Sequence, residues 1–209
     1  MSCDAIKRSF AIMVLLGVIA PLAGCATPPK NINNICQLFE DKRSWYKSAI
    51  ATEKKWKIPV YVTMAFIHQE SKFRAKAAPP RRKILWIIPG PRPSSAYGYA
   101  QALDGTWDSY RKATGNRGGD RDDFDDAADF IGWYNNISYR KNKIKRDDAY
   151  HLYLAYHEGH GGFAKRTYKN KPWLIKVSRK VQKRSLYYQK QYWSCKKELE
   201  KGWIRRLLS

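Results

Sequence analysis

Apolar residues recur at spacings of three and four along most of this 209-residue chain, and no segment sustains the alternation of a half-buried strand. The spacing predicts one helix of about six turns over residues 34–56, with Asn34 as its N-cap. A second helix is expected to open at Pro59, where the missing N–H of proline costs nothing, and to end near Glu70. The chain is therefore expected to be mainly α.

One segment interrupts this helical pattern. Residues 74–95 contain five prolines around a basic triplet and the apolar run Ile84–Ile88, so a Pro-rich basic loop or a small hairpin is expected there. Further helices are predicted from Thr106 to near Gly115, after the acidic run 120–129, from Asp147 or Asp148 to Gly159, and over residues 173–199.

The first 25 residues have the organisation of an export signal. Lys7 and Arg8 precede an apolar run at residues 10–20 that is too short to span a bilayer. The Leu-Ala-Gly-Cys sequence that ends at Cys25 resembles the lipobox of bacterial lipoproteins. That resemblance implies cleavage before Cys25 and lipidation of this residue; ordinary cleavage nearby, which leaves a thiol, is the alternative.

Three segments are therefore expected: a signal peptide over 1–25, a polar tether over 26–33 and one domain over 34–209. Ala26 follows the lipobox cysteine where an aspartate would favour retention at the inner membrane. The resemblance to lipoproteins thus implies a lipid-anchored protein of the bacterial periplasm, held at the outer membrane.

The chain is strongly basic, with 40 Lys and Arg residues against 18 Asp and Glu residues and a formal net charge of +22. Loss of residues 1–25 reduces this charge by only one. Such a balance favours anionic partners, namely lipid headgroups, lipopolysaccharide or a carboxylate-bearing polymer. The basic surface is thus a second expected contact with the membrane. An exported protein rarely meets nucleic acid, so no nucleic-acid partner is expected.

The cysteines fall into two groups. Cys3 leaves with the signal and Cys25 is the expected lipid site, so Cys36 and Cys195 remain, near the two ends of the domain. An oxidising periplasm makes a disulfide between them the expected state. Two buried free thiols are the alternative.

Three segments carry a family resemblance. Residues 58–73, IPVYVTMAFIHQESKF, are an apolar helix that ends in Glu-Ser; residues 95–107 read SAYGYAQALDGTW; and residues 154–163 read LAYHEGHGGF. In this order they resemble the SLT domain of lytic transglycosylases, over roughly residues 35–193. The resemblance implies a lysozyme-like fold, a peptidoglycan substrate and no cofactor.

The resemblance also implies roles for particular residues. Glu70 would be the sole catalytic acid, and Ser71 would orient it or bind sugar. The hydroxyl of Tyr156 would point toward the Glu70 carboxyl. The expected substrate-binding residues are Ser71, Ser95, Gly98, Gln101, Tyr156 and His157.

A single acid suits the chemistry of this family. Glycosidases ordinarily use two carboxylates, one as acid and one to activate or replace water. Lytic transglycosylases use the C6 hydroxyl of the muramic acid as nucleophile and form a 1,6-anhydro product, so one residue serves as acid and then as base. Apolar neighbours such as Phe66, Ile67 and Phe73 are expected to raise the pKa of Glu70.

The sequence departs from the family pattern at several positions. His157 replaces an asparagine, and Tyr99-Ala100 replaces a Leu-Met pair. Lys180 stands where many members have a tyrosine in the last helix, which leaves Tyr188 or Tyr192 as candidates for that role.

Other functions compete with this interpretation. A muramidase would hydrolyse the same bond with Glu158 or Asp104 positioning water, and a non-catalytic lipoprotein would only bind peptidoglycan. A zinc site at His151, His157 and His160 lacks a fourth ligand, so no metal is expected.

Overall fold

The computed structural model describes residues 29–81, 83–84 and 88–207. The expected signal peptide and Cys25 lie outside these residues. Helices dominate the described part, and within it no helix combines the length and apolar character that crossing a bilayer requires. The elements in chain order are α1 (Ile35–Asp41), α2 (Arg43–Trp56), α3 (Val60–Ser71), β1 (Lys83–Ile84), β2 (Ile88–Pro89), α4 (Asp104–Thr114), α5 (Phe124–Asn142), α6 (Ala149–Ala164), the short 3₁₀ helix η1 (Thr167–Asn170) and α7 (Pro172–Leu207).

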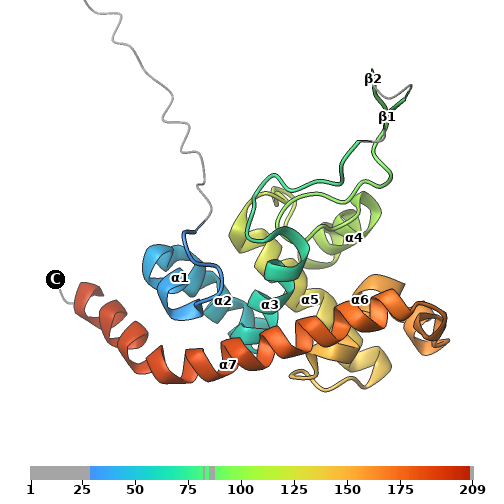
Figure 1. Cartoon of the computed structure of the whole chain (residues 1–209). Helices are drawn as coiled ribbons and strands as arrows, with labels where there is room; N and C mark the ends of the chain where they lie inside the picture. Colours follow the sequence, from blue (N-terminus) through green and yellow to red (C-terminus); the bar gives the residue numbers. More distant parts are fainter. Residues whose placement is uncertain (1–28, 82, 85–87, 208–209) are drawn as a thin grey trace, which may run out of the picture.

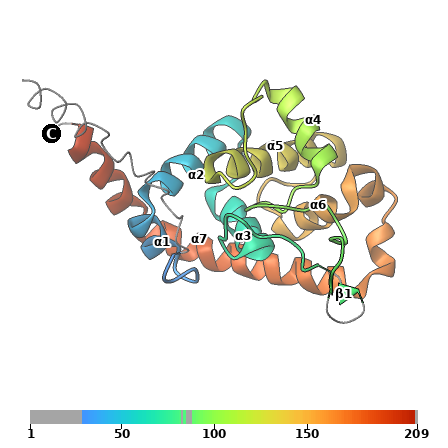
Figure 2. The same ribbon diagram turned by 90° about the horizontal axis from the view of Figure 1, so that it is seen from above.

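Helix α3 lies at the centre of the molecule, with α2, α5 and α7 packed around it (Figures 1 and 2). Over residues 60–67 it is apolar on all sides except at Thr63, and a helix of that kind is stable only when it is surrounded. All of its residues are buried except Gln69 and Glu70. Helix α3 is therefore exposed to solvent only near its C-terminal end, at Gln69 and at the candidate acid Glu70.

The predicted helix over 34–56 is two helices, so this expectation was wrong. The chain breaks at Lys42, whose φ and ψ are −125° and 71°. Phe39 of α1 packs against Tyr192 of α7, whereas Trp45 of α2 stacks on Phe124 of α5. The two helices therefore pack against different parts of the chain. The expected cap is present, because the Asn34 side chain accepts hydrogen bonds from the backbone N–H groups of residues 36 and 37.

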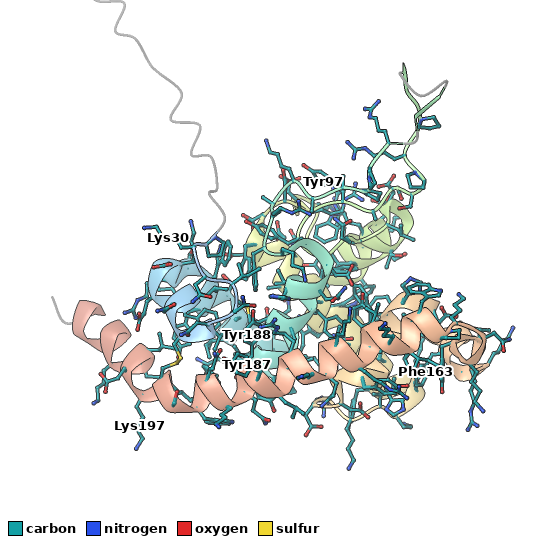
Figure 3. The ribbon with its side chains drawn as sticks, in the orientation of Figure 1. Lys30, Tyr97, Phe163, Tyr187, Tyr188 and Lys197 are labelled. Carbon is teal, nitrogen blue, oxygen red and sulfur yellow. A yellow bond between two sulfur atoms is a disulfide. The ribbon has the colours of Figure 1, made fainter. Side chains whose placement is uncertain are left out.

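Helix α7 runs along one side of the molecule and contacts α1, α3 and α6 (Figure 1). The expected disulfide between Cys36 and Cys195 is present, with 6.1 Å between the two Cα atoms. It fastens α1 to the C-terminal half of α7, and Figure 3 shows it as a yellow bond beside α1.

The proline-rich segment contains the expected hairpin. Strands β1 and β2 pair antiparallel, with Lys83 opposite Pro89 and Ile84 opposite Ile88. The hairpin projects from the loop that joins α3 to α4 (Figure 1). Helix α4 begins at Asp104, two residues before the predicted start.

Two helix ends follow their sequence signals. Helix α5 was expected after the acidic run 120–129, but it begins inside the run, at Phe124. The Asp123 carboxylate caps it by accepting from the N–H groups of Asp125 and Asp126, so the run supplies the cap and the first turn. Helix α6 was expected to end at Gly159, and there it kinks, at φ 74° and ψ 159°, before a further turn continues to Ala164. Only glycine adopts this backbone conformation without strain, so the kink is fixed by the sequence.

Candidate active site

Glu70 is the penultimate residue of α3 and is half-buried. Its carboxyl accepts a hydrogen bond from the Tyr153 hydroxyl of α6. Tyr153 and Tyr156 lie three residues apart on α6, and both rings meet the Phe66 ring edge-on, at centroid distances of 5.3 and 5.4 Å. The acid therefore stands beside an aromatic cluster built from α3 and α6.

Burial raises the pKa of Glu70 to about 7, although the Tyr153 hydrogen bond and the nearby charge of Lys72 both lower it. This is the direction expected from the apolar neighbours, since Phe66, Ile67 and Phe73 are almost wholly buried. A carboxyl in this state exchanges a proton readily near neutral pH.

The tyrosine next to the acid differs from the expected one. The Tyr156 hydroxyl donates to the Ala100 carbonyl oxygen at 2.6 Å, and the Tyr188 hydroxyl donates to the Ile32 carbonyl. Tyr192 is buried against Phe39 of α1. Sequence reasoning missed Tyr153, although its place one helical turn before Tyr156 put it on the same face of α6.

Tyr156 joins α6 to the turn at Gly98–Gln101. Gly98 has a φ of 78°, and a Cβ atom at this position would lie 1.9 Å from the Arg121 carbonyl oxygen, so no other residue fits. The Gly98 N–H and the Gln101 Nε2 both donate to the Ala77 carbonyl, at 2.9 and 2.8 Å. The turn is thus braced on one side by the loop after α3 and on the other by α6.

A family model supports what this geometry indicates. The model for the transglycosylase SLT domain matches residues 13–195, which is most of the chain. The chain belongs to the transglycosylase SLT domain family. Members of this family are generally lytic transglycosylases that act on peptidoglycan. Neither a curated protein nor a solved structure matches the chain.

Within this SLT domain, several of the expected binding residues make internal bonds. The Ser71 hydroxyl donates to the Ile67 carbonyl at 3.1 Å and is buried, so it braces the end of α3. Ser95 accepts from the Asp104 N–H at 3.2 Å, at the start of α4. The Gln101 Nε2 donates to the Gly98 carbonyl at 2.9 Å as well as to the Ala77 carbonyl. All three side chains are thus engaged in hydrogen bonds within the domain.

The other carboxylates of the SLT domain that sequence reasoning considered are held in ion pairs. Glu158 accepts from Lys171 at 2.8 Å, from Thr167 and from His157 at 3.3 Å. Burial alone raises the pKa of Glu158, but these hydrogen bonds outweigh it and lower the pKa overall. Asp104 pairs with Arg121 at 2.8 Å. Each of these carboxylates is thus engaged by a cation.

His157 of the SLT domain lies at the kink of α6, with its ring 4.9 Å from the Trp173 ring of α7. It therefore belongs to the corner where α6, η1 and α7 meet. The described residues contain no group of three His, Cys, Asp or Glu side chains placed to hold a metal ion.

Proposed function

We propose that this SLT-domain protein is a peptidoglycan lytic transglycosylase that cleaves the β-1,4 bond between MurNAc and GlcNAc and leaves 1,6-anhydromuramyl ends. Glu70 is the general acid and then the general base. The observation that carries the proposal is the state of Glu70: a half-buried carboxyl with a pKa raised to about 7 and a hydrogen bond from Tyr153.

In the first half of the reaction the Glu70 proton moves to the glycosidic oxygen, and the bond from this oxygen to C1 of the muramic acid breaks. A pKa near the working pH gives both a protonated fraction and a useful driving force for this transfer. The Tyr153 hydroxyl holds the carboxyl in one orientation throughout.

In the second half the C6 hydroxyl of the same sugar attacks C1, and its proton returns to the Glu70 carboxylate. The nucleophile is part of the substrate and has a high effective concentration, so no second carboxylate is needed to activate water. The engagement of Glu158 by Lys171 and of Asp104 by Arg121 supports this route over a hydrolase that uses either acid.

The test is Glu70→Gln, assayed by mass spectrometry of the fragments released from purified sacculi. This change keeps the shape and removes the transferable proton, so the rate should fall by about 10⁴-fold, the upper end of general acid–base effects. Glu53→Gln is the matched control. Glu53 of α2 is also half-buried with a pKa raised mainly by burial, but its carboxyl accepts from Val60, at the other end of α3.

Each outcome separates the candidate functions. Wild-type fragments lighter by one water than their hydrated counterparts support the transglycosylase. Hydrated fragments that depend on Glu70 indicate the muramidase. Binding to sacculi without any released fragment indicates a non-catalytic peptidoglycan-binding protein, and near-normal turnover by Glu70→Gln places the acid elsewhere.

We also propose that Cys25 is lipidated and holds the protein at the periplasmic face of the outer membrane. The support is the positive region, the short apolar run and the lipobox-like sequence that precede it. Intact mass spectrometry of the membrane-extracted protein should show acyl chains on residue 25, and Cys25→Ser should abolish them. Unmodified protein in the soluble fraction would contradict the proposal.

A further inference from the structure

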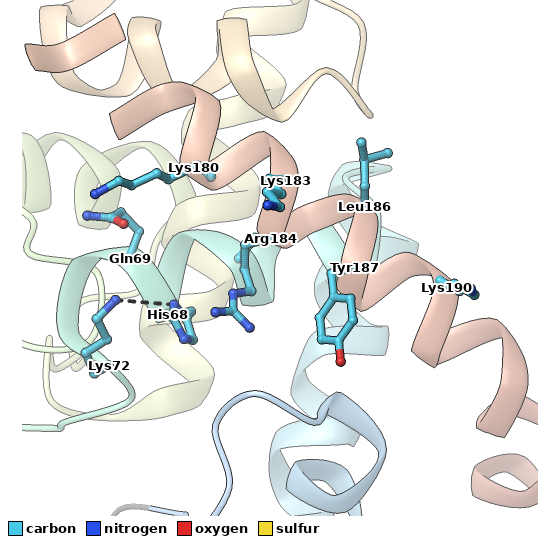
Figure 4. Close-up of a pocket in the computed structure, with 11 residues that line it drawn as sticks. His68, Gln69, Lys72, Lys180, Lys183, Arg184, Leu186, Tyr187 and Lys190 are labelled. Atoms are coloured by element: carbon cyan, nitrogen blue, oxygen red, sulfur yellow. Dashed lines mark hydrogen bonds between the residues drawn. The ribbon is translucent and has the colours of Figure 1, made fainter. Parts of the chain in front are cut away.

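A cationic pocket lies between α3 and α7, on the side of α3 that Gln69 faces (Figure 4). Its volume is about 640 Å³. Helix α7 contributes most of the lining, and α3 and its C-cap contribute the rest. Five basic side chains line it: Lys72, Lys180, Lys183, Arg184 and Lys190.

The charged side chains that line this pocket are all positive. None of its described lining residues is acidic, and none of the five cations forms an ion pair with another described residue. Partial desolvation lowers the pKa of Lys72, and the charges of Arg184 and Lys180 lower it further. Cations that repel one another in this way attract an anion to the space between them.

Two of the cations are already held in place. The Lys72 ammonium lies 3.4 Å from the His68 Nδ1, and because an ammonium only donates, this nitrogen is the acceptor. Burial and the charges of Lys72 and Arg184 lower the pKa of His68 to about 3, so the imidazole stays neutral. The Arg184 guanidinium stacks 5.4 Å from the Tyr188 ring centroid. Less side-chain entropy is lost when an anion binds to groups already fixed in this way.

The pocket adjoins the candidate acid. Gln69 lines it and directly precedes Glu70, and Lys72 interacts electrostatically with the Glu70 carboxyl. A substrate whose sugar lies at Glu70 can therefore reach this pocket with a side group, because Lys72 belongs to the pocket lining and is near enough to Glu70 to lower its pKa. The muramic acid of peptidoglycan carries a short peptide on its lactyl group, and that peptide bears free carboxylates.

We propose that this pocket binds a carboxylate of the peptide borne by the muramic acid, so that the enzyme prefers peptide-bearing strands to bare glycan. This inference rests on the proposed function. The guanidinium of Arg184 offers a planar pair of donors suited to a carboxylate, and Lys180 and Lys72 supply point charges around it. A recessed site of this kind suits a flexible side group better than a flat bilayer.

The test compares two substrates, peptide-bearing glycan strands and the same strands stripped of peptide by an amidase. Wild-type protein should show a KM roughly tenfold lower for the peptide-bearing strands, as expected for hydrogen bonds between charged groups. Lys180→Gln and Arg184→Gln should each raise the KM for those strands and leave kcat within about twofold. Lys180 is exposed, so its substitution tests the pocket even if Arg184→Gln disturbs the packing on Tyr188.

Lys176→Gln is the matched control. It removes one exposed positive charge from α7, one turn before Lys180 and outside the pocket, so its KM should equal that of the wild type. An equal rise in KM for all three variants would assign the effect to net charge and overturn the proposal. Equal wild-type KM values for both substrates would also overturn it, while leaving the proposed function intact.

A binding measurement separates the two proposals. Calorimetry of the whole chain with the free stem peptide, and with the same peptide amidated at its carboxylates, requires no turnover. Binding that needs the carboxylates and weakens in Arg184→Gln supports the pocket even if no strand is cleaved. If the wild type binds no peptide and Arg184→Gln loses affinity only for phosphatidylglycerol vesicles, the pocket is a membrane contact and the inference is refuted.

Discussion

Holding the Glu70 carboxyl away from water favours its protonated form, and the same burial links the stability of the fold to pH. The pKa of Glu70 is about 7 in the folded protein and 4.5 as its ordinary value. Between these values the folded state binds more protons than the unfolded state, so the free energy of unfolding falls as pH rises. Below pH 4.5 the burial of Glu70 does not lower the free energy of unfolding, and above pH 7 the full reduction is present.

Glu70→Gln should therefore stabilise the fold at pH 8 and not at pH 4. The gain at pH 8 should be about 2 kcal/mol, since a half-buried group realises only part of the pKa difference. Urea unfolding of the variant and the wild type at both pH values measures it, and the comparison at each pH cancels the other titrating groups. The same gain at both pH values would show that burial of the charge is not its cause.

Removing the Tyr153 hydroxyl should shift the pH dependence of turnover. In Tyr153→Phe the Glu70 carboxylate loses a hydrogen bond that stabilises its charged form, so its pKa should rise. The limb of kcat/KM that falls above pH 7 should move upward by about one pH unit. Tyr110→Phe, which removes a buried hydroxyl bonded to Asp129, is the control and should leave this limb unmoved. An unshifted limb in Tyr153→Phe would show that the Tyr153 hydroxyl does not control the pKa of the catalytic acid.

The sequence predicted the buried helix that carries Glu70, the candidate acid, but not the tyrosine beside it. The apolar run and the following acid were visible, because an all-apolar helix must be surrounded. Which of two tyrosines, Tyr153 or Tyr156, reaches the acid depends on how α6 is rotated against α3. That rotation is set by packing. The sequence motif therefore indicated the face of α6 that lies beside the acid, but it indicated the hydroxyl of Tyr156 where the structure has that of Tyr153.

At the scale of elements, the turn at Gly98 allows a matched comparison of two glycines. Gly98 and Gly115 have similar positive φ values, 78° and 74°. A Cβ at Gly98 meets the Arg121 carbonyl at 1.9 Å, whereas a Cβ at Gly115 meets nothing within 4 Å. The two substitutions share the conformational strain, and only one adds a collision with backbone.

Gly98→Ala should destabilise the fold by about 2–3 kcal/mol more than Gly115→Ala, whose own cost should be about 1 kcal/mol. Gly98→Ala should also lower turnover, because the displaced turn carries the Ala100 carbonyl that Tyr156 binds. Thermal unfolding and sacculus digestion measure the two effects. Equal losses of stability in the two variants would show that the turn has room to shift.

The helices were largely predictable as elements, and their junctions were not. The signals at Asn34, at Asp123 and at Gly159 act locally, through side-chain caps and backbone freedom. The break at Lys42 has no such signal. It arises because α1 packs against α7 and α2 against α5, and these partners come much later in the chain.

For the whole molecule, the Cys36–Cys195 bond is the main covalent constraint. It joins residues 159 positions apart, so it removes much conformational freedom from the unfolded chain. The double variant Cys36→Ser, Cys195→Ser should lose about 3–5 kcal/mol of unfolding free energy. Urea unfolding should show reduced wild-type protein to be as unstable as the variant. If the double variant and the reduced wild type are both as stable as the oxidised wild type, the packing of α1 on α7 holds the two helices together without the disulfide.

The cationic pocket illustrates what a sequence does not contain. The net charge predicted an anionic partner, but not where the cations gather. Lys72 and the four basic residues of α7 are more than a hundred positions apart, and only the packing of α7 on α3 brings them together.

The disulfide also makes the chain between Cys36 and Cys195 a closed ring, which contains the hairpin and the whole candidate site. A protease that cuts this ring once, for example in the projecting hairpin, opens it without releasing a fragment. The two pieces stay joined through sulfur, and the helices around α3 keep their contacts. Nicked protein would therefore run as one species until a reductant separated it into two.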